Sequence, residues 1–233
     1  MPAWDGKIEA MTADGRHRAR RGEGDRLRGE ILAAAEALLV ETADESAVSI
    51  RAIADRVGVT PPSIYRHFAD KDALLQEVCR EVFLRLDDTL EKAAAGACDP
   101  LDELTRKGRA YVEFGLAHPE SYRILFMIHH DHDMEKPVPG SVDAADLPGA
   151  SAFVHLQETV HRVIELGGPD SPKPDEYTFT CSVWSGVHGI TALRISMPTF
   201  PWPSIDEQLA IMAEPWRRVL CPVEAEPSRP RRR

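Results

Sequence analysis

Apolar residues recur at helical spacing along nearly the whole chain, and no convincing run alternates between apolar and polar residues as a strand would. Beyond residue 71 the pattern predicts a long helix that ends near Gly96, and then shorter helices over residues 100–118, 119–128, 151–166, 175–196 and 204–220. The segment 131–150 is rich in Pro, Gly and Asp and is expected to be a loop. The fold class that follows is all-α.

Residues 48–71 predict two short helices joined by a tight turn. The first helix has an apolar stripe at positions i, i+3, i+4 and i+7, made of Ile50, Ile53, Ala54 and Val57. Ser49 is its expected N-cap, and Gly58 ends it in the left-handed conformation that glycine adopts at low cost. Thr60 is expected to supply the N-cap oxygen of the second helix, with Pro61 in its first turn. This arrangement is a helix-turn-helix.

The second of these helices has the residue types that contact DNA. We expect Ile64 and Phe68 to point inward, and an outward face made of Pro62, Ser63, Tyr65, Arg66 and His67. Helix-turn-helix proteins place the start of this helix in the major groove to read bases, while flanking polar groups hold phosphates. Arg51, on the preceding helix, can reach a guanine edge or the backbone. The predicted DNA-binding residues are Ser49, Arg51, Thr60, Pro61, Pro62, Ser63, Tyr65, His67 and Lys71.

This segment resembles the DNA-binding domain of the TetR family of bacterial transcription regulators. The resemblance is carried by the amphipathic first helix, the IADRVGVT turn, the Tyr-Arg-His-Phe end of the recognition helix and the opening of the next helix at 71–75. The string HPESYRILF at 118–126 resembles a recurring element of TetR-type regulatory domains. The resemblance implies a homodimer that binds a palindromic double-stranded DNA operator, most simply as a repressor, and releases it when a small, largely apolar effector binds.

The predicted helix 175–196 has two faces of different kinds. A small face combines Ser182, Ser185, Gly186, Gly189 and Ala192, and a bulky face combines Trp184, Val187, His188, Thr191 and Ile195. The Trp, His and Gly of WSGVHG at 184–189 resemble the signature of a TetR C-terminal domain class named for those residues. By that resemblance the dimer interface is the small stripe Ser182, Ser185, Gly186 and Gly189, with the bulky face turned inward.

Aromatic and polar side chains on these helices are candidates for an effector pocket, because a few polar groups in an apolar concavity are typical of ligand sites. The candidates are Tyr111, Phe114, His118, Tyr122, Arg123, Phe126, Met127, Phe153, Trp184 and His188. Ordinary core packing remains the alternative interpretation for each aromatic residue. A second functional hypothesis is a DNA-bound protein whose C-terminal domain recruits a protein partner without a small-molecule effector.

The distribution of charged residues supports the division of the chain into a DNA-binding part and a regulatory part. The protein has 233 residues, with 38 acidic and 28 basic side chains. Residues 1–71 hold 12 acidic and 11 basic side chains, which leaves 26 and 17 for the rest, so the acidity lies mainly outside the helix-turn-helix. The expected organisation is a disordered Arg-rich arm at 1–24, the DNA-binding domain at 25–71, the ligand-binding and dimerisation domain at 72–222, and a disordered tail at 223–233.

Other functions find little support in the sequence. No apolar run reaches the length of about 18 residues that a membrane span needs, and we expect a cytoplasmic protein that contacts no membrane. The chain has no GxSxG, HExxH or glycine-rich phosphate loop, so we expect neither an enzyme nor a bound cofactor. His129, His130, Asp131, His132 and Asp133 are interpreted as surface composition, although a metal sensor stays an alternative. The four cysteines form no CxxC pair, and a redox-sensing pair also stays open.

Overall fold

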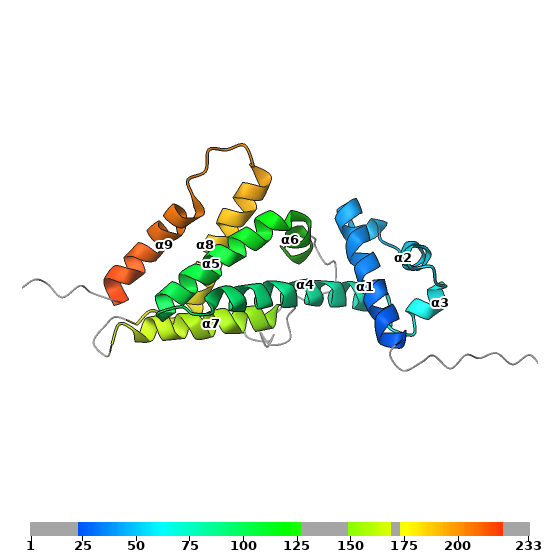
Figure 1. Cartoon of the computed structure of the whole chain (residues 1–233), viewed down its shortest axis with the longest axis horizontal. Helices are drawn as coiled ribbons and strands as arrows, with labels where there is room; N and C mark the ends of the chain where they lie inside the picture. The colour runs from blue at the N-terminus through cyan, green and yellow to red at the C-terminus, as the bar shows by residue number, and fades with distance from the viewer. Residues whose placement is uncertain (1–22, 127–148, 169–172, 221–233) are drawn as a thin grey trace, which may run out of the picture.

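The computed structural model describes residues 23–126, 149–168 and 173–220, and every regular element in these ranges is helical, which confirms the all-α prediction (Figure 1). The α-helices are α1 Glu23–Thr42, α2 Ile50–Val57, α3 Pro61–Ile64, α4 Lys71–Ala94, α5 Pro100–Ala117, α6 Pro119–Phe126, α7 Ala150–Glu165, α8 Glu176–Ser196 and α9 Ile205–Leu220. A 3₁₀ turn, η1, covers Glu45–Ala47 between α1 and α2. Within the described ranges no helix is long and apolar enough to cross a bilayer.

Several predictions lie outside the described residues. The Arg-rich arm, apart from the start of α1, falls within residues 1–22, and the C-terminal tail falls within 221–233. Most of the predicted loop and the His129–Asp133 cluster fall within 127–148, together with Met127.

Side-chain caps fix the helix ends where the sequence indicated them. The Ser49 hydroxyl accepts a hydrogen bond from the Ala52 backbone N–H at 3.1 Å, and Gly58 ends α2 with a φ of 79°. Asp99 caps α5 by accepting from two backbone N–H groups. The predicted cap at Thr60 is wrong in its chemistry: Thr60 precedes α3, but its hydroxyl pairs with the Ser63 hydroxyl at 3.2 Å instead of accepting from the backbone.

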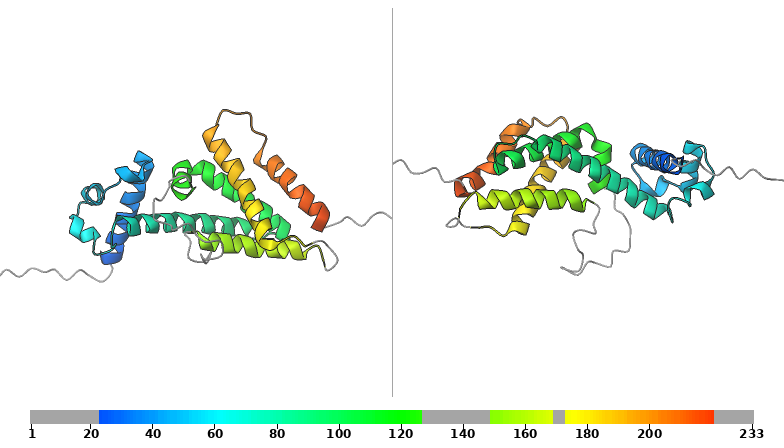
Figure 2. Two further views of the ribbon diagram at one scale, coloured as in Figure 1. Left: turned by 180° about the vertical axis from the view of Figure 1, so that it is seen from behind. Right: turned by 60° about the horizontal axis from the view of Figure 1, so that its bottom comes forward.

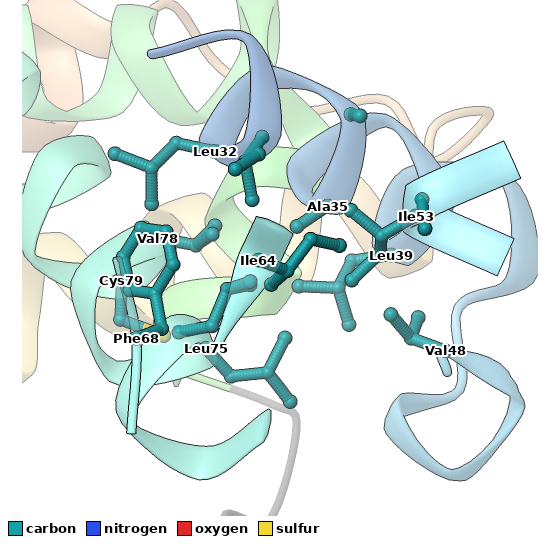
Figure 3. Packing of buried hydrophobic residues seen from close by; sticks show 14 of the residues in the cluster. Leu32, Ala35, Leu39, Val48, Ile53, Ile64, Phe68, Leu75, Val78 and Cys79 are labelled. Carbon is teal, nitrogen blue, oxygen red and sulfur yellow. The ribbon is translucent and has the colours of Figure 1, made fainter. Parts of the chain in front are cut away.

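The DNA-binding end has its own hydrophobic core, shared by α1, α2, α3 and the start of α4 (Figure 3). Figure 3 shows Leu32, Ala35 and Leu39 of α1 facing Ile64, Leu75 and Val78, with Val48 and Ile53 closing one side. Ile64 and Phe68 are buried, so their predicted inward orientation is confirmed. This packing holds α2 and α3 at fixed positions at one end of the molecule.

The long helix α4 connects that core to the C-terminal bundle. Its first turns contribute Leu74, Leu75 and Val78 to the DNA-binding core, and its later turns contribute Val82 and Leu86 to a second core. Figures 1 and 2 show α7 running alongside α4, with α8 and α9 at the end of the molecule farther from α1–α3. Helix α5 lies centrally and packs against α4, α7, α8 and α9. Helix α4 is therefore packed into both hydrophobic cores.

Helix α6 makes a second connection between the two cores. Ile124 is buried in the DNA-binding core, whereas its neighbours Tyr122 and Leu125 belong to the C-terminal core. On the polar side, Glu36 of α1 forms an ion pair with Arg85 of α4 and lies within 3.4 Å of the Ser121 hydroxyl of α6. The DNA-binding end is thus joined to the bundle through α6 as well as through α4.

Candidate functional site

The first candidate site is the exposed face formed by α2 and α3. Arg51, Pro62 and Arg66 are exposed, and the Tyr65 side chain is 54% exposed although it is a large aromatic residue. Figure 1 shows α2 and α3 at the end of the molecule opposite α9, with α1 between them and the rest of the bundle. The other predicted DNA-binding residues, apart from Ser63, are also accessible: Ser49 and Thr60 are exposed, and Pro61, His67 and Lys71 are half-buried. The DNA contacts themselves stay a prediction.

Ser63 departs from the prediction that it faces outward. It is only 9% exposed, because its hydroxyl accepts a hydrogen bond from Arg66 at 3.0 Å and pairs with Thr60 on its other side. Helix α3 has a single turn before the chain becomes irregular, so the face assigned from an extended helical period does not apply to it. Arg66 therefore presents the polar group at this position.

Lys71 has a structural partner as well as a predicted one. Its ammonium group donates to the Glu45 carbonyl oxygen at 3.2 Å and so holds η1 against the start of α4. A lysine with a single neutral partner at a partly exposed position still has donors for a phosphate. Its predicted contact with the DNA backbone is compatible with this geometry.

The second candidate site is a cavity of about 420 Å³ within the C-terminal bundle. Four predicted ligand-binding residues line it: Tyr111, Phe126, Phe153 and Trp184. Phe83, Leu86 and Leu90 of α4, Leu104 of α5 and Leu156 of α7 add to its apolar wall. Its size suits a small organic molecule, and its wall is mostly apolar with a few polar groups, which is the usual composition of a ligand pocket.

Tyr122 and His188 lie behind this wall and do not line the cavity. The Tyr122 hydroxyl is 2.6 Å from His188 Nδ1, and the Tyr111 hydroxyl is 3.2 Å from the same nitrogen. Burial lowers the pKa of His188 and raises the pKa of Tyr122 to about 12, so at neutral pH the hydroxyls keep their protons and form hydrogen bonds with an uncharged imidazole, whose tautomer sets their direction. Trp184 in turn donates its indole N–H toward the Tyr111 oxygen at 3.4 Å. These hydrogen bonds fix the orientation of the Tyr111 and Trp184 rings at the cavity wall.

Three further predicted ligand residues lie away from the cavity. Phe114 is buried in the core but does not line the space. His118 is exposed at the end of α5, with its ring 5.2 Å from that of Phe114. Arg123 forms an ion pair with Glu120 at 2.9 Å on the same helix. Sequence placed these residues on apolar segments, but the polar ends of His118 and Arg123 reach the surface instead of converging on a ligand.

The polar groups that do line the cavity were missed by the sequence analysis. They are Asp87 and Glu91 of α4, Lys107 of α5 and His155 of α7. His155 Nδ1 lies 2.9 Å from Asp87, and the buried Lys107 ammonium lies 2.7 Å from Glu91. The available signal was spacing: Phe83, Asp87 and Glu91 are each one turn apart, and Lys107 is one turn before Tyr111, so charged and aromatic residues share a face.

The predicted dimer stripe on α8 is divided in the structure. Ser182 and Ser185 are exposed, and a Cβ atom at Gly189 would have no neighbour within 4 Å. At Gly186 a Cβ would lie 2.2 Å from Met212 Cε, so this glycine accommodates α9 of its own chain. The open part of the stripe is available for a second copy, and its role as a dimer seam stays a prediction.

A helix-turn-helix mounted on a larger helical bundle defines a class of DNA-binding regulators. Comparisons with known proteins agree with this class. Residues 31–78 match the family described as bacterial regulatory proteins, tetR family, and residues 104–214 match the tetracyclin repressor-like C-terminal domain. Together the two matches include the helix-turn-helix and most of the bundle. The chain is a transcriptional regulator of the TetR family.

The individual proteins that this chain resembles have low sequence identity to it. The HTH-type transcriptional activator FasR of Mycolicibacterium smegmatis is 29% identical over 137 residues, and the match covers 59% of this chain and 61% of that protein. The chain thus matches less than two thirds of that relative's length. A structure of a Rhodococcus sp. RHA1 protein of unknown function is 26% identical, with a TM-score of 0.66 over 88% of this chain and 99% of that one. FadR of Bacillus subtilis in complex with stearoyl-CoA shares the fold, with a TM-score of 0.62 at 12% identity over 84% of this chain and 98% of that one.

Proposed function

We propose that this regulator binds a palindromic operator as a homodimer, represses from it, and releases it when a small, largely apolar molecule enters the cavity of the C-terminal bundle. The observation that carries the proposal is the 420 Å³ cavity walled by Phe126, Phe153 and Trp184. An apolar cavity of this size inside a close-packed bundle offers a matching ligand van der Waals contacts on all sides.

The cavity also distinguishes between the two functional hypotheses. A protein that only recruits a partner through its C-terminal domain has no need of an internal cavity and is expected to have a filled core and an exposed apolar patch. Here the Trp184 side chain is 38% exposed although it belongs to the cavity wall, so small molecules can approach the indole. This geometry favours the effector-binding regulator over the partner-recruiting protein.

The proposed homodimer is supported by the geometry that a palindromic operator requires and by the exposed surface of α8 and α9. Two recognition helices must be linked to read half-sites about 34–36 Å apart. Around the small residues of α8 lie exposed apolar side chains, namely Leu193 and Met197, and Ile211 of α9 is 76% exposed. Apolar side chains beside small residues suit close packing of helices from a second copy.

Release requires the ligand to bind the DNA-free form more tightly than the DNA-bound form. Helix α6 is well placed to couple the two, because Phe126 lines the cavity while Ile124 is buried in the DNA-binding core. A ligand that moves Phe126 would displace Ile124 and so tilt the α1–α4 unit relative to the bundle. We propose this movement, together with α4, as the route from cavity to recognition helix.

The relatives bear on the effector and on the direction of regulation. FadR, which shares the fold, was crystallised with stearoyl-CoA, a ligand with a long apolar chain. FasR is named as an activator, whereas we propose repression here. A promoter carrying the selected operator would show increased transcription on deletion of the protein if it is a repressor, and decreased transcription if it is an activator.

The test uses operator fragments selected from random DNA by the protein itself and a ten-carbon alcohol, n-decanol, as an apolar probe. Wild-type protein is expected to bind decanol and to lose operator affinity as it does so. Trp184→Ala should keep operator affinity and melting temperature but respond less to decanol. If Trp184 only fills the core, the change should cost about 3–5 kcal/mol of stability and weaken DNA binding directly. That result, with no protection of wild type by decanol, would contradict the proposal.

A further inference from the structure

The charged cluster at the cavity contains more negative than permanent positive charges. Three carboxylates lie in one connected cluster, those of Asp87, Glu91 and Glu103, and two permanently charged cations accompany them, Lys107 and Arg162. Lys107 Nζ lies 2.7 Å from Glu91 and 3.1 Å from Glu103, and Arg162 lies 2.6 Å from Glu103. Both cations are therefore committed to the two glutamates, and the cluster has one carboxylate more than it has permanent positive charges.

Asp87 is the carboxylate without a permanent countercharge. It is 8% exposed, and its hydrogen-bond partner among the described residues is the imidazole of His155, with Nδ1 at 2.9 Å. The hydrogen bond to Asp87 raises the pKa of His155, so His155 supplies a countercharge only while its imidazole is protonated, whereas a bound ammonium group supplies one at any pH near neutrality. A carboxylate removed from water is costly unless a full positive charge and hydrogen bonds compensate it. Asp87 therefore provides a site for one additional cation at a point where the cavity wall is formed by α4 and α7.

The rest of the wall also favours a cation with an apolar body. The cavity-lining aromatic residues are Phe83, Tyr111, Phe126, Phe153, Tyr177 and Trp184. Phe83 is one turn before Asp87 on α4, and Phe153 lines the same cavity from α7, the helix that also carries His155, so aromatic rings share the cavity wall with the charged cluster. The faces of such rings attract organic cations, and their area accommodates an aliphatic or aromatic tail.

From this arrangement we propose that the cavity binds an amphipathic organic cation, a protonated amine, with its ammonium group at Asp87 and Glu91 and its apolar part against the aromatic wall. The inference rests on the proposed function, because it names the chemical class of the effector for the same cavity. An ammonium group can donate to both carboxylates, while Lys107 keeps its bonds to Glu103 and to the Thr159 hydroxyl at 3.0 Å.

A divalent metal fits the same residues less well. The donor atoms of Asp87, Glu91 and His155 lie within 4.8 Å of one another, which is close enough to surround one ion. However, Glu91 Oε1, which lies 3.8 Å from His155 Nδ1, is also the atom that accepts from the buried Lys107 ammonium at 2.7 Å. A doubly charged ion on that oxygen would stand next to an ammonium group and would leave the cluster with excess positive charge. When the His155 imidazole is neutral, a single positive charge balances the three carboxylates together with Lys107 and Arg162.

The experiment compares three ligands that share a ten-carbon tail and differ in the head group: decylamine, n-decanol and decanoate. Calorimetric titration of the full-length protein at pH 7, where an alkyl amine is protonated, should give an affinity for decylamine about tenfold or more above that for decanol, because a charge-assisted hydrogen bond replaces a neutral one. Decanoate should bind most weakly, since its carboxylate faces Asp87 and Glu91.

Two variants assign the selectivity to the cluster. Asp87→Asn should reduce decylamine affinity to about that of decanol and leave decanol affinity unchanged, and Glu91→Gln should act in the same direction on a more exposed residue. Asp88→Asn is the matched control, because Asp88 is the adjacent carboxylate on α4 but is exposed and pairs with Lys92 at 2.6 Å. The melting temperature of each variant identifies any loss of binding that is due to unfolding. If Asp87→Asn is unfolded, the decylamine affinity of Glu91→Gln tests the cation site instead.

The possible failures are distinguishable. If decanol and decylamine bind equally and Asp87→Asn changes neither, the cation inference is overturned while the apolar effector site stands. If decanoate binds best, Lys107 binds an anionic head group and the cation inference is again overturned. Titration with Mn²⁺ or Zn²⁺ alone that gives binding abolished by Asp87→Asn would assign the cluster to a metal. If none of the three ligands binds, the proposed effector function of the cavity fails with it.

Discussion

The Tyr122 hydroxyl lies 2.6 Å from Nδ1 of His188 and 3.3 Å from the carbonyl oxygen of the same residue, so one side chain of α6 holds both the ring and the backbone of α8. Tyr122 is 1% exposed, and its ring stacks on that of His188 with centroids 5.4 Å apart. Because Ile124, two residues later, is buried in the DNA-binding core, this contact ties α8 to the helix that reaches that core. The Tyr122 hydroxyl thus lies where the C-terminal bundle meets the DNA-binding end of the molecule.

Removing that hydroxyl tests how much the junction contributes. We expect Tyr122→Phe to lower the free energy of unfolding by about 1 kcal/mol, because the half-buried imidazole of His188 loses its closer hydrogen-bond partner while the Tyr111 hydroxyl remains at 3.2 Å. The melting temperature should fall by about 2–4 °C for a chain of this size. Tyr65→Phe, on an exposed tyrosine, is the control and should not change the melting temperature. An equal shift of the melting temperature in both variants would show that the Tyr122 hydrogen bond does not contribute to stability.

An ion pair between α1 and α4 predicts a pH dependence of stability. The hydrogen bond from Arg80, with a second from Arg28, lowers the pKa of Glu77 from 4.5 to about 2. A carboxyl whose pKa is lowered in the folded state stabilises the protein above the unfolded pKa and loses that contribution as the pH falls from 4.5 toward 2.

We therefore expect Glu77→Gln to lower the melting temperature at pH 7 by about 2–4 °C, or about 1 kcal/mol after allowing for solvent screening. The difference from wild type should shrink steadily as the pH is lowered below 4.5. Glu81→Gln removes the neighbouring exposed carboxylate, which lies 3.3 Å from Arg80, and should have a smaller and flatter effect. A difference that is constant from pH 7 to pH 3 would show that the ion pair is not its cause.

Local signals explain which parts of the architecture could be predicted from the sequence. Ser49, Gly58 and the Asp99-Pro100 pair act within one turn of their own position, so the residue types alone fix where helices begin and end. The cap role of Thr60 and the outward orientation of Ser63 were predicted incorrectly, because α3 is only one turn long and the two hydroxyl groups there bond each other instead of the backbone. Helical periodicity is informative only where the helix is long enough to have a period.

The polar cluster of the cavity shows what the sequence could not provide. Asp87 and His155 are 68 residues apart, and their contact depends on how α7 lies along α4. Conversely, His118 and Arg123 looked like buried polar residues because their segments are apolar, but each lies where its side chain reaches the surface or a neighbour on its own helix. The way the helices pack against one another decides which polar residues come together, and this packing cannot be inferred from the sequence of any one helix.

The predicted phosphate contact of Lys71 has a measurable signature. Each phosphate contact that is lost lowers the slope of log affinity against log salt concentration by about one. Lys71→Ala should therefore weaken binding to operator and to unrelated DNA alike and reduce the slope by about one, whereas Arg51→Ala should change the preference at particular base pairs. Lys92→Ala, at the far end of α4, is the control and should leave the slope unchanged. An unchanged slope in Lys71→Ala would limit Lys71 to its bond with the Glu45 carbonyl.

The dimer prediction can be tested at Gly189 without disturbing the monomer. A Cβ atom there would meet nothing within 4 Å in its own chain, so Gly189→Leu should fold with a nearly unchanged melting temperature of the monomer. If α8 of a second copy packs on this stripe, the leucine should force the helices apart at a cost of about 1–3 kcal/mol or more. Sedimentation should then show monomers, and operator affinity should fall because the two half-sites are no longer read by one linked pair. Gly29→Leu places the same side chain at an equally open position on α1 and should remain dimeric. A full-strength dimer in Gly189→Leu would place the interface elsewhere on the molecule.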